Sequence, residues 1–151
     1  MPRQYYEYFQ NIDSRTFEAI KEAKEDGVWR VEEDEGFDIL RDLASKLADI
    51  YNIPTPTLSQ GTREVYFPAE EHIKLPRVSL VSFLHEFRHH MQHHGMQHYD
   101  RIENDARGWS ISAFSYALPS NFDSAWEREM IWFMPSYDPN WYEDREEEYQ
   151  P

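Results

Sequence analysis

The amino-acid sequence predicts an α+β fold, in which several helices pack around a small mixed β-sheet. Apolar residues recur at helical spacing before residue 54 and after residue 79. Between residues 55 and 75 the pattern changes to short runs of β-branched and aromatic residues, separated by glycine and proline. A chain of 151 residues is long enough for one domain with a sizeable core.

Two helices are expected in the N-terminal third of the chain. Asp13 or Ser14 can cap the first helix, which should end near Gly27. The second helix should stop at Asn52 and Pro54, because the residue before a proline disfavours helical backbone angles. Its apolar stripe consists of Phe37, Leu40, Leu43, Leu47 and Ile50. Both helices are interpreted as scaffold that packs the core.

Three short strands are expected next. They should lie at residues 57–59, 65–67 and 73–75. Gly61 separates the first from the second, and a turn that begins at Pro68 separates the second from the third. Pro68 and Pro76 cannot donate to a hydrogen-bond ladder, so they should mark strand ends or a sheet edge.

Three further helices complete the predicted fold. Ser79 can cap the first of them, which should end at Gly95. Asp100 can cap the next, which should end at Pro119. The apolar residues of this second helix recur every three or four positions, at Ile102, Ala106, Trp109, Ala113 and Tyr116. A last short helix is expected around residues 124–134. Its inward-facing residues should be Trp126, Met130 and Phe133.

The predicted domain organisation is a single domain over residues 1–134, followed by a tail over residues 135–151. The tail contains an acidic run that starts at Glu143. Segments with high charge and few apolar residues do not bury enough surface to fold. The tail is therefore expected to be mobile.

Composition excludes several classes of function. The chain has 15 Lys and Arg residues against 29 Asp and Glu residues, which gives a net charge of -14. Binding to nucleic acid or to an anionic membrane surface needs clustered positive charge, so neither partner is expected. The absence of cysteine excludes disulfides, thiolate metal ligands and a cysteine nucleophile.

The expected location is the cytoplasm. A membrane-spanning helix needs about 20 consecutive apolar residues, and the sequence contains no such stretch. The first seven residues also lack the apolar region of a secretory signal.

The helix that follows Ser79 carries the pentapeptide His85-Glu86-Phe87-Arg88-His89, an H-E-x-x-H signature. Two histidines four residues apart lie on the same helix face, so both imidazoles can bind one zinc ion at about 2.0–2.1 Å. Glu86 then lies beside the metal, where it can take a proton from a metal-bound water. The sequence therefore predicts a catalytic zinc centre with Glu86 as general base.

A catalytic zinc ion usually has three protein ligands. Glu103 is the best third candidate, because it lies on the next predicted helix, across a turn at Gly95. His93 faces the same way as the histidine pair, but it lies about 12 Å along the helix axis from His85. His93, His98 and Asp100 stay open as alternatives. His90 and His94 are interpreted together with His93 as solvated or supporting groups.

The pentapeptide and the downstream segment Glu103-Asn104-Asp105-Ala106 together resemble the motifs of the gluzincin-type zincin metallopeptidases. The nearest likeness is to the compact group that includes the phage-immunity antirepressor peptidases, and the membrane CAAX-type proteases share the E-x-x-A pattern. The resemblance covers residues 55–118. It implies a zincin-like fold with an edge strand beside the active-site helix. It also implies His85, His89 and Glu103 as zinc ligands and Glu86 as catalytic base.

Three features depart from the pattern of that family. Arg88 is charged where the central position of the pentapeptide is normally uncharged. Arg107 stands where the second motif usually ends in Asp or Asn. The interval from His89 to Glu103 is also short for this group. These differences bear more on peptidase activity than on metal binding.

The leading hypothesis for function is zinc-dependent hydrolysis of a peptide bond, with Glu86 passing the proton of the attacking water to the leaving amine. An extended protein or peptide substrate should pair with the edge strand near Val65–Phe67. The candidates for a donor to the oxyanion are Tyr99, Arg101, Arg107 and His98. A non-catalytic zincin-like module that binds metal and a protein partner is the alternative. A histidine-rich metal buffer is a third interpretation. No oligomeric state follows from the sequence.

Overall fold

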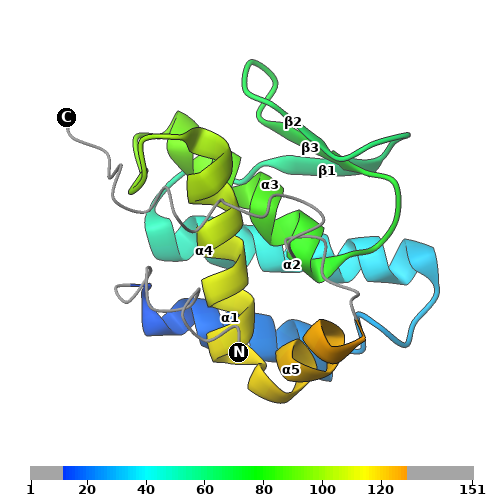
Figure 1. Ribbon diagram of the computed structural model, residues 1–151. Coiled ribbons are helices and arrows are strands. Elements are labelled where there is room, and N and C mark those ends of the chain that lie inside the picture. Colours follow the sequence, from blue (N-terminus) through cyan, green and yellow to red (C-terminus); the bar gives the residue numbers. More distant parts are fainter. Residues whose placement is uncertain (1–11, 129–151) are drawn as a thin grey trace.

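Five helices and a three-stranded sheet make up residues 12–128, the part of the chain that the computed structural model describes (Figure 1). In chain order the elements are α1 (Ser14–Glu25), α2 (Glu33–Tyr51), β1 (Thr57–Gln60), β2 (Val65–Phe67), β3 (His72–Leu75), α3 (Leu80–His93), α4 (Ile102–Ala117) and α5 (Pro119–Glu127). The predicted α+β class, with helices around a small mixed sheet, is confirmed.

Three of the predicted helix ends are set by the residues that the sequence indicated. The side chain of Asp13 accepts a hydrogen bond from the backbone N–H of Arg15 and caps α1. Ser79 caps α3 in the same way, by accepting from the backbone N–H of Ser82. α2 ends at Asn52, whose φ of 55° lies in the left-handed region that asparagine tolerates better than most residues.

Two predicted helix starts were wrong. Arg101, not Asp100, occupies the N-cap of α4, and it makes no capping bond from its side chain. α5 begins at Pro119, earlier than residue 124, because proline fits the first turn of a helix, where the N–H that it lacks has no partner. Pro119 therefore separates two helices. α5 ends at Glu127, with Arg128 as its C-cap, and the rest of the helix predicted to reach residue 134 lies outside the described residues.

The apolar stripe predicted for α4 is only partly buried. Ala106, Trp109 and Ala113 lie in the core, whereas Ile102 is 51% exposed and Tyr116 is 41% exposed. On α5, Trp126 packs against the core as a partly buried residue. Met130 and Phe133, together with the tail at 135–151 and the domain limit at 134, lie outside the described residues.

The sheet has the strand order β1-β3-β2, with β1 parallel and β2 antiparallel to β3. Leu58 of β1 and Tyr66 of β2 are both paired with Ile73 of β3, so the three side chains form one row across the sheet. All three are buried. β2 is an edge strand, and within residues 12–128 no strand pairs with its outer side.

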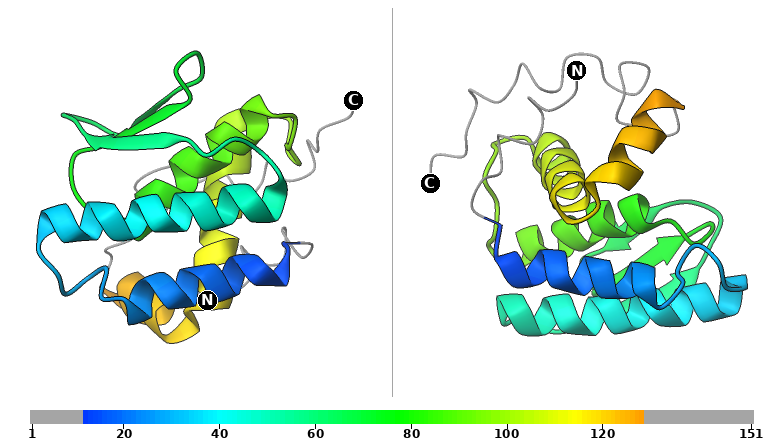
Figure 2. Two further views of the ribbon diagram at one scale, coloured as in Figure 1. Left: turned by 180° about the vertical axis from the view of Figure 1, so that it is seen from behind. Right: turned by 90° about the horizontal axis from the view of Figure 1, so that it is seen from below.

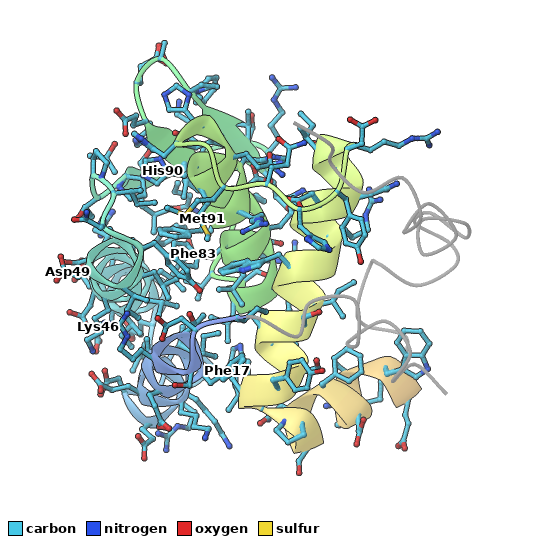
Figure 3. All side chains as sticks on the ribbon, turned by 90° about the vertical axis from the view of Figure 1, so that its left-hand side faces the viewer. Phe17, Lys46, Asp49, Phe83, His90 and Met91 are labelled. Carbon is cyan, nitrogen blue, oxygen red and sulfur yellow. The ribbon has the colours of Figure 1, made fainter. Side chains whose placement is uncertain are left out.

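The helices form layers on one face of this sheet. α2 and α3 pack against the strands, α1 lies beside α2 on the side away from the sheet, and α4 runs across α3 and α1 (Figures 1 and 2). Phe83 and Met91 of α3 fill the space between α3 and α2 (Figure 3). Among residues 12–128, no helix is long and apolar enough to cross a membrane.

Candidate metal centre

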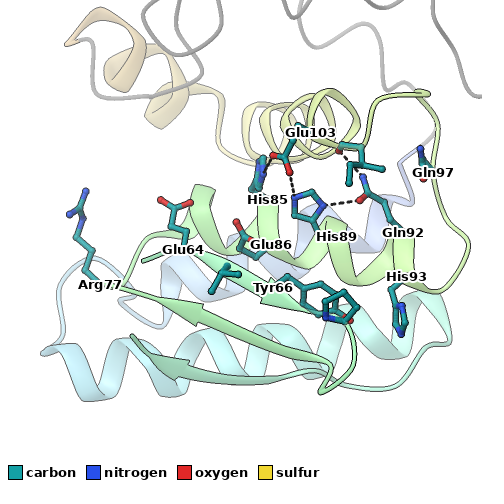
Figure 4. Close-up of a pocket in the computed structure, with 13 residues that line it drawn as sticks. Glu64, Tyr66, Arg77, His85, Glu86, His89, Gln92, His93, Gln97 and Glu103 are labelled. Carbon is teal, nitrogen blue, oxygen red and sulfur yellow. Dashed lines mark hydrogen bonds and ion pairs between the residues drawn. The ribbon is translucent and has the colours of Figure 1, made fainter. Parts of the chain in front are cut away.

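The three predicted zinc ligands come together where the first turn of α4 meets the middle of α3. His85 and His89 lie one helical turn apart, with ring centroids 4.9 Å from each other. Glu103, the second residue of α4, extends over both rings (Figure 4). Its Oε1 lies 3.1 Å from Nε2 of His85, and its Oε2 lies 3.1 Å from Nε2 of His89. One carboxylate thus bridges the two imidazoles.

This donor set fits a zinc ion. One ligand atom of each side chain lies within 4.8 Å of those of the other two. Ligand atoms of a tetrahedral zinc site lie about 3.4 Å from one another, given metal–ligand distances of about 2.1 Å. Two imidazole nitrogens and one carboxylate oxygen also form a ligand combination that catalytic zinc sites use.

The negative charge of Glu103 suits a cation. Hydrogen bonds from His85 and His89 hold the pKa of the Glu103 carboxyl far below its usual range, and the N-terminus of α4 favours the negative charge as well. Burial lowers the pKa of His85. Burial acts in the same direction on His89, but its hydrogen bonds with Glu103 and Gln92 outweigh that effect and raise its pKa.

Gln92 sets the orientation of the His89 ring. Nδ1 of His89 lies 2.8 Å from Oε1 of Gln92, and an amide oxygen can only accept, so Nδ1–H is the donor. This bond leaves Nε2 of His89 directed at Glu103 (Figure 4). The amide nitrogen of Gln92 donates to the carbonyl of Ile102 at 2.9 Å and to Asp105 at 2.8 Å. The ligand ring is thereby fixed to both helices.

Asp105 is a fully buried carboxylate that ties α3 to α4. It accepts two hydrogen bonds from Arg88, at 2.8 and 3.3 Å. It also accepts from the backbone N–H groups of His98 and Tyr99, at 2.7 and 2.9 Å. The Arg88 guanidinium lies 5.6 Å from the ring centroid of Trp109. The charge at residue 88, which departs from the family pattern, is therefore neutralised inside the fold.

Glu86, the predicted base, is 6% exposed and lies beside the ligands (Figure 4). Burial, reinforced by the nearby negative charges of Glu64 and Glu103 and opposed by His89, raises the pKa of Glu86 to about 7. A carboxyl group with this pKa both takes and releases a proton near neutral pH. Glu64, which also lines the cleft, is held by a hydrogen bond of 2.8 Å from Ser82 of α3.

A cleft of about 870 Å³ contains these groups. α3 forms its floor, the edge strand β2 forms one wall with Val65 and Tyr66, and the first turn of α4 forms the opposite wall (Figure 4). Arg77 and His93 line its two ends. An edge strand beside the helix of the pentapeptide is the arrangement that the sequence predicted.

The other residues singled out by the sequence lie elsewhere. Among residues 12–128, His98 and Asp100 neither line this cleft nor join His85 and His89, while His93 belongs to a separate cluster. None of the four candidates for the oxyanion donor lines the cleft. For Tyr99 the cause is the loop before α4, which Asp105 binds: Tyr99 is 4% exposed and turned into the core.

Two residues of the site were missed. Gln92 has a weak signal in the sequence, because a residue three positions after His89 shares its helix face. Glu64 has none, since only the course of the loop before β2 brings it to the cleft.

Comparisons with protein-family models, with curated proteins and with solved structures find no match to this chain. The zincin resemblance accordingly stays a prediction from two short motifs. Function is inferred below from the side chains of the site.

Proposed function

We propose that this protein is a zinc-dependent metallopeptidase of the zincin kind. One observation carries the proposal: the Glu103 carboxylate joins Nε2 of His85 to Nε2 of His89 at 3.1 Å each, in a cleft that also holds a buried Glu86. Metal-assisted hydrolysis needs metal ligands and a proton acceptor beside them. α3 and α4 supply the candidate ligands, and Glu86 is the candidate proton acceptor.

His85, His89 and Glu103 would hold the zinc ion, which when bound supplies a Lewis acid that polarises a carbonyl group and lowers the pKa of water. Glu86 accepts a proton from the attacking water at its carboxylate and donates it to the nitrogen of the leaving amine. Gln92 keeps Nδ1 of His89 protonated, so Nε2 is the nitrogen that would give up its proton and bind the metal.

The substrate is an extended protein or peptide segment. β2 borders the cleft and is an edge strand, so a segment in the cleft can add to its open side through backbone hydrogen bonds. Glu64 and Arg77 lie on the cleft wall and carry opposite charges. They are placed to contact side chains of such a segment.

A zinc assay combined with a cleavage assay tests this function. Untagged protein should contain equimolar zinc, and His89→Ala and Glu103→Ala should lose it. Glu86→Gln should keep the zinc and cleave no peptide in a pooled peptide library, because the shape of the side chain is retained and the base is removed. Glu127→Gln, which changes an exposed acid on α5, serves as the matched control and should equal wild type. Zinc-free wild-type protein, or cleavage by Glu86→Gln, contradicts the proposal.

A non-catalytic zinc module that holds a protein partner is the second candidate. The observation that favours it is the lack of any predicted oxyanion donor on the cleft wall, as far as the structure describes the chain. Transition-state stabilisation by such a donor is usually a large part of catalysis. A wild-type protein that contains zinc and cleaves no member of the library would select this second function.

A further inference from the structure

We propose a second binding site for a divalent cation of the zinc class, formed by Glu71, His93 and His94. This cluster lies where the turn between β2 and β3 meets the C-terminal end of α3. It shares no ligand with the centre at Glu103, so binding at each site can be tested independently of the other.

The cluster has the same donor chemistry as the first centre. One ligand atom of each of the three side chains lies within 4.8 Å of the other two. Oε1 of Glu71 lies 2.8 Å from Nε2 of His94, and the rings of His93 and His94 have centroids 5.0 Å apart. Two imidazoles and one carboxylate are a ligand set that favours zinc over calcium or magnesium.

His90 lies close to this cluster, but both of its ring nitrogens make hydrogen bonds within the fold. Its Nε2 lies 2.7 Å from the carbonyl oxygen of Pro54, which can only accept, so Nε2 carries the proton. In the neutral ring Nδ1 is then an acceptor, and the hydroxyl of Tyr66 donates a hydrogen bond to it at 2.7 Å. His90 is fully buried and uses both nitrogens within the fold. It anchors α3 to the sheet and leaves cation binding to its neighbours.

The ligands of the second site are reachable from solvent. The side chain of His94 is 24% exposed and that of Glu71 is 33% exposed, and His93 is an exposed residue at the end of the cleft (Figure 4). His94 is the C-cap of α3. The last carbonyl groups of a helix carry partial negative charge, which adds to the charge of Glu71 and attracts a cation.

The backbone at Glu71 supports a role for its side chain. Glu71 has a φ of 48°, a left-handed conformation that residues other than glycine, asparagine and aspartate rarely adopt. Glycine would fit this turn with less strain. A strained residue at a turn is a reason to look for a function of its side chain, and here that side chain is the carboxylate aimed at His94.

A cation bound here would join the β2–β3 turn to α3. The same turn and strand supply Tyr66 and Pro68 to the wall of the cleft, while α3 forms the floor. The second site would therefore fix the position of one cleft wall and stabilise the protein against unfolding, by the mass action of a ligand that binds only the folded state.

The test is a titration of the metal-free protein with Zn²⁺ in competition with a chromophoric chelator. Wild type should bind about two equivalents, as expected for two separate sites with three protein ligands each. Glu71→Gly and His94→Ala should each bind one equivalent, and Glu103→Ala should retain one. Glu71→Gly also relieves the left-handed strain, so a loss of binding in this variant cannot be assigned to a distorted turn. His98→Ala removes a histidine outside both clusters and should behave as wild type.

The possible results separate the two sites. One equivalent in wild type that Glu103→Ala abolishes overturns the second site and leaves the first intact. Two equivalents in Glu71→Gly overturn the assignment of the second site. One equivalent in wild type that Glu71→Gly abolishes and Glu103→Ala retains supports the second site and contradicts the first. The melting temperature gives a second readout: the second equivalent of zinc should raise it in wild type and should have no such effect in Glu71→Gly.

Discussion

Replacing Glu86 by glutamine should stabilise the metal-free protein, by an amount that grows as the pH rises from 4.5 to 7. The carboxyl group is 6% exposed, and its burial raises its pKa from the ordinary value of 4.5 to about 7. A raised pKa in the folded state means that the neutral form is favoured there. The contribution of Glu86 to stability is therefore fully present below pH 4.5 and is lost as the pH rises through 7.

The size of this effect follows from the two pKa values. Each tenfold change in the proton-binding constant is worth about 1.4 kcal/mol, so the change from 4.5 to about 7 corresponds to about 3 kcal/mol. Glutamine has nearly the same shape and no charge at any pH in this range. Glu86→Gln should consequently match wild type near pH 4.5 and exceed its free energy of unfolding by up to about 3 kcal/mol at pH 8.

Urea unfolding of both proteins in the presence of a chelator, at several pH values from 4.5 to 8, measures this difference. Effects of titrating groups far from Glu86 are common to the two proteins and cancel in the comparison. Glu127→Gln, a change at an exposed acid outside the cleft, serves as the control for the loss of one carboxylate. A difference between Glu86→Gln and wild type that stays constant with pH, or that shrinks as the pH rises, would refute the burial argument.

Two further changes test the supports of the metal centre. Gln92→Ala should weaken zinc binding about 10- to 100-fold, because the partner that orients the His89 ring is lost; unchanged affinity in a chelator competition would show that the ring needs no such partner. Asp105→Ala should cost about 3–5 kcal/mol in urea unfolding, because Arg88 is left as a buried charge without its carboxylate. Asp105→Asn also removes the charge but keeps one acceptor oxygen, so a loss of similar size is expected, and a much smaller loss than in Asp105→Ala would count against a charge effect.

Much of the local structure was predictable from the sequence. The caps at Asp13 and Ser79 and the left-handed end at Asn52 follow from side chains that satisfy or relax the nearest backbone groups. The start of α4 was not predictable in this way. The buried carboxylate of Asp105 holds the loop before α4 by accepting hydrogen bonds from the N–H groups of His98 and Tyr99. A contact of this kind cannot be recognised from a capping motif in the sequence.

The candidate site likewise contains one feature that the sequence predicts directly and others that depend on the tertiary structure. The helical period alone places His85 and His89 on one face, so the pair could be recognised from spacing. Glu103 was selected by its motif, and the structure brings it to both histidines. The alternatives His98 and Asp100 lie at similar distances along the chain from the histidine pair. The loop and the first turn of α4 direct the side chain of Glu103 toward the pair, and His98 and Asp100 do not join it.

By itself, the sequence determined the class of fold, the order of its elements and the pair of histidines that a single helix presents. These features depend on residues within a few positions of one another. Only the tertiary structure decided which carboxylates meet which histidines: Glu103 joins the pair on the middle of α3, and Glu71 joins His94 at its end. The physical reason is that these contacts connect separate elements, and the packing of α4 and of the β2–β3 turn against α3 sets their geometry.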